Sequence, residues 1–120
     1  MPPVHVGDWS GEEKRRHKRV SLHVPIECRS GPVTLEARAE NVSVSGILIR
    51  TPTPFPDDEA ITLRFALPGS EHRIECRARV AHAVADAFMG VEFVDLPTDS
   101  LDRIEQYIAA APALQAKIKQ

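Results

Sequence analysis

The sequence predicts an all-β protein: a six-stranded antiparallel β-barrel with one C-terminal α-helix and a mobile basic N-terminal arm. Six short segments alternate apolar and polar side chains, and turn-forming residues separate them. Only one later segment has apolar residues at the three- and four-residue spacing of an amphipathic helix. Short strands joined by tight turns are typical of small barrels, and an all-β sandwich is the alternative. A length of 120 residues and an apolar content of 42% suit one domain with a modest core.

The first two expected strands form a hairpin. The alternation runs over residues 20–29 and resumes over 33–40, with the turn sequence "SGP" between them. Pro25 marks an edge on the outer side of the first strand. A short strand is expected at 47–51, and three more at 61–67, 74–80 and 89–93. Alanines flank His82, which predicts a phase slip at a β-bulge.

The helical period begins after the last strand. Leu101, Ile104, Ile108 and Ala111 fall on one helical face, and Thr98 or Asp99 is expected to cap the start. The chain therefore divides into a flexible tail over residues 1–13, a barrel-and-helix domain over 14–110, and a C-terminal extension over 111–120 that adds a short helix.

Composition argues against nucleic-acid-binding, membrane-spanning, secreted and metal-binding proteins. The net charge of −2 does not favour a nucleic-acid partner, and no apolar stretch reaches the roughly 18 residues of a membrane span. No signal peptide is recognised, so we expect a cytoplasmic protein. The two cysteines, Cys28 and Cys76, are expected to be buried thiols. The histidines at 5, 17, 23, 72 and 82 have no metal-ligand spacing, so we expect neither a metal nor a cofactor.

Catalytic motifs are not found. The sequence has no GxSxG, P-loop or GxGxxG pattern, and the acidic stretch "PDDE" reads as a solvated turn. No nucleophile is paired with a base. We therefore expect a binding domain and not an enzyme.

Positive charge is concentrated where the first strand begins. Five of the 15 Lys and Arg residues lie within 14–19, and Arg15, Arg16 and Arg19 are among them. Arginine presents a planar fork of donors that suits phosphate and the O6/N7 edge of guanine. A solvated basic tail is the alternative, and charge alone favours it. Direct connection to a strand, however, lets the arginines reach a defined place on the barrel.

The second polar constellation is "NVSVSG", residues 41–46. Asn41 is able to bond a base edge, Ser43 and Ser45 are able to reach phosphate, and Gly46 permits an unusual backbone or a close ligand approach. Taken alone, an ordinary turn explains this loop better. His82 is either a histidine at the barrel rim, the commoner case, or an imidazole that stacks on a bound base.

Together the two segments resemble the signature of the PilZ family, bacterial receptors for cyclic di-GMP. Residues 15–19 match an RxxxR motif, and residues 41–46 match [DN]xSxxG. "GVEFVDLP", residues 90–97, resembles the last core strand of the family and its exit into the helix. The resemblance covers about residues 12–110. It implies a six-stranded barrel with a C-terminal helix, and an intercalated dimer of cyclic di-GMP on the outer surface.

The resemblance also implies roles for individual residues. Arg15 and Arg19 would grip phosphate and guanine with Arg16 as an extra contact, while Asn41 and Ser43 would bind guanine and its neighbouring phosphate. Gly46 would leave room for the ligand, and the remaining members of the implied site are Ser45, His82 and Gly90. Two departures weaken the expected affinity: Asn41 has one acceptor oxygen where Asp has two, and His82 stands where many members carry a bulkier aromatic.

The functional expectation is a cyclic di-GMP receptor that acts as an adaptor. The arm would fold over the ligand, and the new surface would bind an unidentified downstream protein, with the chain a monomer or weak dimer. One alternative is a ligand-independent interaction module of the same fold, whose arm docks on an acidic partner. Another is nonspecific single-strand binding, which needs aromatic platforms that the six aromatic residues hardly provide.

Overall fold

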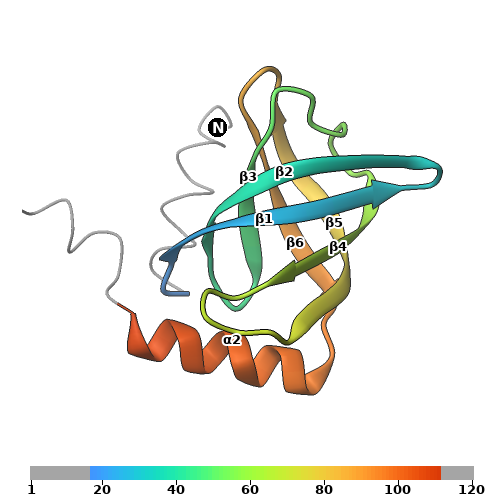
Figure 1. Ribbon diagram of the computed structural model, residues 1–120. Helices are drawn as coiled ribbons and strands as arrows, with labels where there is room; N and C mark the ends of the chain where they lie inside the picture. Colours follow the sequence, from blue (N-terminus) through green and yellow to red (C-terminus); the bar gives the residue numbers. More distant parts are fainter. Residues whose placement is uncertain (1–16, 112–120) are drawn as a thin grey trace, which may run out of the picture.

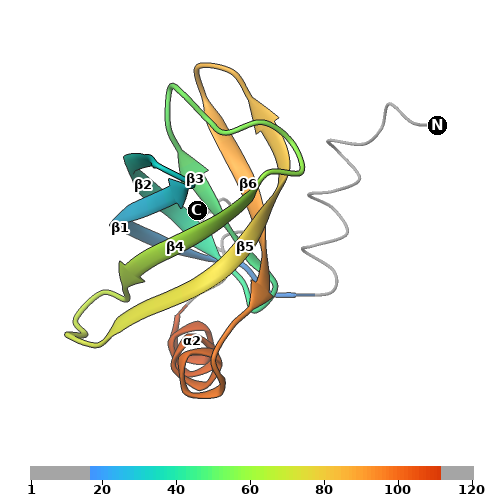
Figure 2. The same ribbon diagram turned by 90° about the vertical axis from the view of Figure 1, so that its right-hand side faces the viewer.

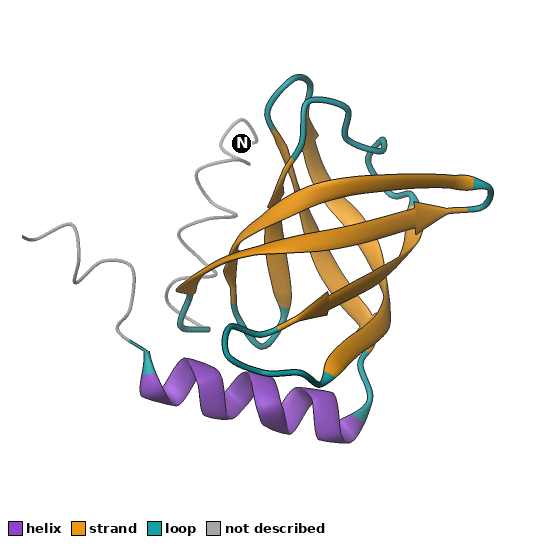
Figure 3. Cartoon of the chain, viewed as in Figure 1, coloured by secondary structure: helices purple, strands orange, loops and turns teal. Residues whose placement is uncertain are grey.

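A computed structural model describes residues 17–111, and these form a closed antiparallel barrel with strand order β1-β2-β3-β6-β5-β4 (Figure 1). The helix lies across one end of the barrel (Figure 3). This architecture confirms the predicted barrel with its C-terminal helix and excludes the sandwich. The predicted flexible tail over 1–13, most of the basic arm and most of the C-terminal extension over 111–120 lie outside the described residues. The elements are β1 (Val20–Ser30), β2 (Val33–Val42), β3 (Gly46–Arg50), β4 (Ala60–Ala66), β5 (Arg73–Val84), β6 (Phe88–Asp95) and α2 (Thr98–Ala110).

The barrel closes where β1 meets β4. The predicted hairpin of β1 and β2 is present, and Gly31 takes a left-handed φ of 57° in its turn. Pairing of β1 with β4 begins at Ile26 and ends at Arg29. Pro25 immediately precedes this paired stretch, as expected for a residue that lacks a backbone N–H.

Bulges decide which side chains face outward. In β2 the pairing with β3 slips between Ala39 and Asn41, so Val42 turns into the core and Asn41 turns out. In β5 the pairing with β6 slips between Val80 and His82, which confirms the predicted bulge. The strand continues to Val84, beyond the predicted end at residue 80, because pairing with β6 resumes after the bulge, from His82 to Val84.

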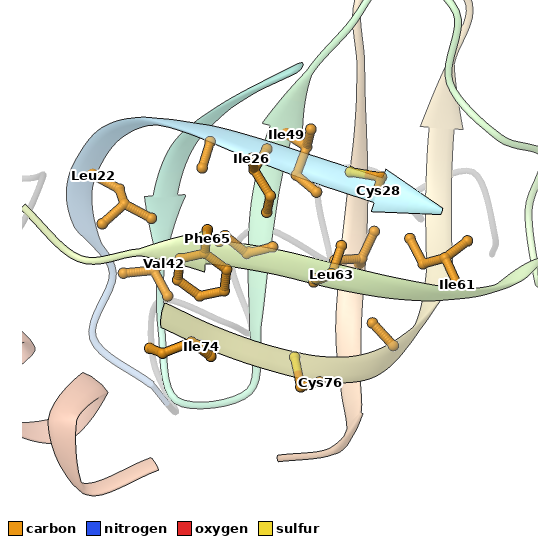
Figure 4. Close-up of a cluster of buried hydrophobic side chains, with 14 of the residues drawn as sticks. Leu22, Ile26, Cys28, Val42, Ile49, Ile61, Leu63, Phe65, Ile74 and Cys76 are labelled. Carbon is orange, nitrogen blue, oxygen red and sulfur yellow. The ribbon is translucent and has the colours of Figure 1, made fainter. Parts of the chain in front are cut away.

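The core fills the inside of the barrel. Figure 4 shows side chains from β1, β4 and β5 that meet there with others from β2 and β3. Cys28 and Cys76 are buried free thiols, as predicted, and burial raises the pKa of each to about 12. Both residues are register partners of Leu63, so they lie two strands apart, on the order of 10 Å. A disulfide needs Cα atoms closer than about 7 Å, so the two thiols are not poised to pair.

Helix α2 closes the lower end of the barrel (Figure 2). Ile104 is fully buried in the core and Ile108 nearly so, in agreement with the predicted apolar face. The Tyr107 hydroxyl donates a 2.7 Å hydrogen bond to the Ser21 carbonyl, which ties the helix to β1. The predicted cap by Thr98 or Asp99 is wrong, because the N-cap position is Pro97 and no side chain caps the helix. Within residues 17–111 no helix is long and apolar enough to cross a membrane.

Candidate functional site

Arg19 joins the two predicted constellations. It directly precedes β1 and is only 8% exposed, and its Nη1 donates a 2.7 Å hydrogen bond to Oδ1 of Asn41. Arginine has only donors, so the Asn41 atom facing it must be the carbonyl oxygen, and the amide NH₂ points elsewhere. The other motif arginines, Arg15 and Arg16, lie outside the described residues.

The loop between β2 and β3 is held by its own serines. The Ser43 N–H donates to the Gly46 carbonyl at 2.9 Å, and the Ser45 N–H donates to Ser43 Oγ at 3.1 Å. The two hydroxyl oxygens lie 3.0 Å apart, and His17 Nδ1 lies 3.1 Å from Ser45 Oγ. Ser43 is fully buried, so its hydroxyl shapes the loop in this structure, while Ser45 is half-buried and contacts the incoming chain.

Gly46 has a structural reason to be glycine. A Cβ added there would lie 2.2 Å from the carbonyl oxygen of Val91 on the paired strand β6. Such a contact is far inside van der Waals distance, so any side chain would push β3 and β6 apart. The role implied by the family motif, room for a ligand, stays a prediction.

Backbone register places three of the predicted residues in one row. Reading across β1, β2, β3, β6 and β5, the register partners are Ser21, Asn41, Leu48, Gly90 and His82. We call these five residues the outer row. Ser21, Leu48 and Gly90 each lie between two core residues of their strand, and Asn41 and His82 join the row at the two bulges. The row brings Asn41, Gly90 and His82 to one face of the barrel. It also adds Leu48, a residue that the sequence analysis missed.

A signal for Leu48 was present in the sequence. In "ILIR" the two isoleucines, Ile47 and Ile49, are both buried in the barrel, and Leu48 between them is only half-buried. A single apolar side chain at a solvent-facing position is common, so Leu48 gains its interest from Gly90 and His82, which lie in the same row. With Gly90 beside it, Leu48 makes a low, apolar floor between Asn41 and His82.

His82 carries an unusual nitrogen. Its Nε2 is buried and has no hydrogen-bond partner among residues 17–111. Leaving a buried polar atom unpaired costs about 1–3 kcal/mol, so such atoms call for an explanation such as ligand binding. The position of this imidazole at the end of the outer row makes it a candidate ligand contact.

Two other arginines on this face form ion pairs with carboxylates. Arg79 pairs with Glu92 at 2.8 Å and with Asp58 at 3.2 Å. Arg50 pairs with Glu40 at 2.9 Å. Among the described residues no group of His, Cys, Asp and Glu side chains is arranged to hold a metal ion. The arrangement suits recognition of a polar, stackable ligand by an arginine, an amide and a flat floor.

Comparison with known proteins identifies the family. The model of the PilZ domain matches residues 13–110, so the chain belongs to the PilZ family. PilZ domains are typically receptors for cyclic di-GMP, and they are non-catalytic modules. No curated protein matches the chain.

Solved structures share the fold. MotI/DgrA, an inhibitor of motility from Bacillus subtilis, superposes with a TM-score of 0.71 at 20% identity, over 79% of this chain and 49% of that one. The chain thus spans about half of that protein. The PilZ domain of YcgR from Escherichia coli, solved with cyclic di-GMP, gives 0.63 at 14% identity, over 82% and 91% of the two chains. The PilZ domain of CeSA from a cellulose-synthesizing bacterium gives 0.58 at 15%, over 75% and 93%.

Proposed function

We propose that this chain is a receptor for cyclic di-GMP, which it binds on the outer face of β2, β3, β6 and β5. Arg19 and Asn41 hold one edge of the ligand, and the outer row supplies the floor on which it lies. Arg15 and Arg16 add phosphate and guanine contacts from the N-terminal arm. The observation that carries the proposal is the 2.7 Å contact of Arg19 with Asn41, which unites the RxxxR and [DN]xSxxG motifs at one place.

Recognition of guanine follows from the donors and acceptors at this place. Arginine pairs with the O6/N7 edge of guanine in two parallel hydrogen bonds and also with phosphate. Because the Asn41 oxygen is engaged by Arg19, its NH₂ group is the part that faces a ligand, and it donates to a guanine or phosphate oxygen. The buried Nε2 of His82, which has no partner within the described range, gains one when the ligand lies against the imidazole.

Binding changes the surface of the protein. We propose that the arm closes over the ligand, so that arm, dinucleotide and barrel together form a new surface for a downstream protein. Ordering a residue of the arm costs on the order of 1–2 kcal/mol, so the contacts of its arginines must offset that cost. The half-buried Ser45, which lies beside His17, links the arm entry to the loop.

Substitution of the motif arginines tests the proposal. Each charge-assisted hydrogen bond contributes about 1.5–3 kcal/mol, and each arginine makes two parallel bonds in this proposal, so Arg19→Ala or Arg15→Ala should weaken cyclic di-GMP binding by at least ~100-fold. Arg29→Ala and Arg103→Ala are matched controls, because both arginines are exposed and lie away from the outer row. Titration calorimetry and a thermal unfolding curve should be recorded for each variant. Undiminished binding by the folded Arg15 and Arg19 variants would contradict the proposal.

A further inference from the structure

A hollow of about 390 Å³ opens on the same outer face, toward the turn between β5 and β6. Leu48, which belongs to the outer row, lines it together with Arg50 and Phe88. Arg50 and Phe88 are register partners across β3 and β6, directly beside the row. The volume falls within the range of about 300–1,000 Å³ that is typical of small-molecule sites. The hollow therefore extends the proposed ligand face by one further row.

Side-chain and backbone contacts connect the walls of the hollow at two places, Glu40 and Ala87. Glu40 accepts a 2.9 Å hydrogen bond from Arg50 Nε and lies 3.4 Å from His23 Nδ1, so the Arg50 side chain is oriented. The Thr51 N–H donates to the Ala87 carbonyl at 3.1 Å. This bond joins the loop after β3 to the turn between β5 and β6, which lie side by side at the upper end of the barrel in Figures 1 and 2. Leu48, Arg50 and Phe88 stand on the paired strands β3 and β6, so the floor of the hollow has a defined geometry.

Asp86 supplies an acceptor at the rim. It is exposed, has a left-handed φ of 65°, and forms no hydrogen bond or ion pair with any other residue in the described range 17–111. Aspartate tolerates this backbone conformation better than most residues. Its carboxylate is thus available to a ligand in the hollow.

We propose that this hollow binds a guanine base, the outer base of a stacked cyclic di-GMP assembly; the inference rests on the proposed function. The ring lies against Phe88 and Leu48. The Nη groups of Arg50 donate to the O6 and N7 of the base, because Nε is already used by Glu40. The Asp86 carboxylate accepts from N1–H and the 2-amino group.

The charges of the hollow favour a base over a phosphate. Among the described residues that line it, Glu40 and Asp86 supply two carboxylates and Arg50 supplies one cation. A phosphate would be repelled by both carboxylates. Guanine is neutral, has a donor edge for a carboxylate and an acceptor edge for an arginine, and presents a flat face to an aromatic ring.

The test is titration calorimetry of the full chain with cyclic di-GMP, using Phe88→Ala, Arg50→Ala and Asp86→Asn. Loss of an aromatic–base stack should weaken binding of the outer cyclic di-GMP molecule of the stack by roughly 10- to 100-fold. At micromolar concentration the number of cyclic di-GMP molecules bound per chain should therefore fall. Val84→Ala is the matched control, since Val84 is the register partner of Phe88, is 37% exposed, and does not line the hollow. Arg50 and Asp86 are exposed, so their variants test the site even if Phe88→Ala proves unstable.

Cyclic di-IMP provides an independent readout, because it lacks the 2-amino group of guanine. The wild type should prefer cyclic di-GMP, and Asp86→Asn should reduce that preference more than Val84→Ala does. If all three hollow variants bind with wild-type stoichiometry, affinity and base preference, the inference is overturned while the proposed function stands. If the wild type itself binds no cyclic di-GMP, the proposed function fails and the inference fails with it.

Discussion

Replacing Gly46 by alanine should destabilise the barrel before any ligand is added. The new Cβ would lie 2.2 Å from the Val91 carbonyl oxygen, where carbon–oxygen contacts normally begin near 3.3 Å, so β3 and β6 must separate by about 1 Å. Overpacking of this kind costs about 1–3 kcal/mol. Strain on the 2.9 Å bond from Ser43 N–H to the Gly46 carbonyl adds about 1 kcal/mol. The free energy of unfolding should therefore fall by about 2–4 kcal/mol, and Tm by roughly 10 °C or more.

Urea and thermal unfolding of the ligand-free protein, followed by circular dichroism, measure this effect. Gly31→Ala is the control, because Gly31 has a φ of 57° but no atom within 4 Å of an added Cβ. Its free energy of unfolding should fall only by the roughly 1–2 kcal/mol that alanine costs in the left-handed conformation. If Gly46→Ala unfolded at the wild-type midpoint and lost only ligand affinity, the close approach of β3 and β6 would not be the reason for this glycine.

Three further predictions follow from the core and the helix. Ile104→Ala should lower the free energy of unfolding, measured by urea denaturation, by about 2–5 kcal/mol, because this side chain on the inner face of α2 is fully buried. Tyr107→Phe should cost about 1 kcal/mol in the same assay, since it removes the bond to the Ser21 carbonyl. The thiols of Cys28 and Cys76 have pKa values near 12 in the folded state against an ordinary value of 9.0. Between these values the unfolded state binds fewer protons, so stability should fall as pH rises, by up to about 1.4 kcal/mol per pH unit for each thiol. Replacing either cysteine by alanine should flatten that slope, and an unchanged slope would contradict the assignment.

The barrel could be predicted because alternation is a direct consequence of a half-buried strand. Val20, Leu22, Ile26 and Cys28 are buried as their spacing requires. Strand ends were harder to place. The continuation of β5 to Val84 depends on a bulge, and a bulge reverses the alternation that sequence reasoning follows.

Some contacts of the candidate site could be predicted from the sequence, and others could not. The proximity of Arg19 and Asn41 could be expected from the resemblance to a known family, although the outward orientation of Asn41 depends on a bulge in β2. Leu48 could not be joined to Gly90 and His82 from the sequence. Their common row depends on the register of three strands, β3, β6 and β5, which only the closed barrel defines. The uncapped start of α2 was missed because Thr98 and Asp99 are good capping residues that the helix takes into its first turn.

Isothermal titration of the wild-type chain with cyclic di-GMP, with GTP and cyclic AMP as controls, tests the central claim most directly. We expect saturable heat with cyclic di-GMP alone, at micromolar affinity or tighter, from a protein whose fold is verified by circular dichroism. Absence of heat from the folded protein, or equal heats for all three nucleotides, would contradict the receptor function proposed for this site.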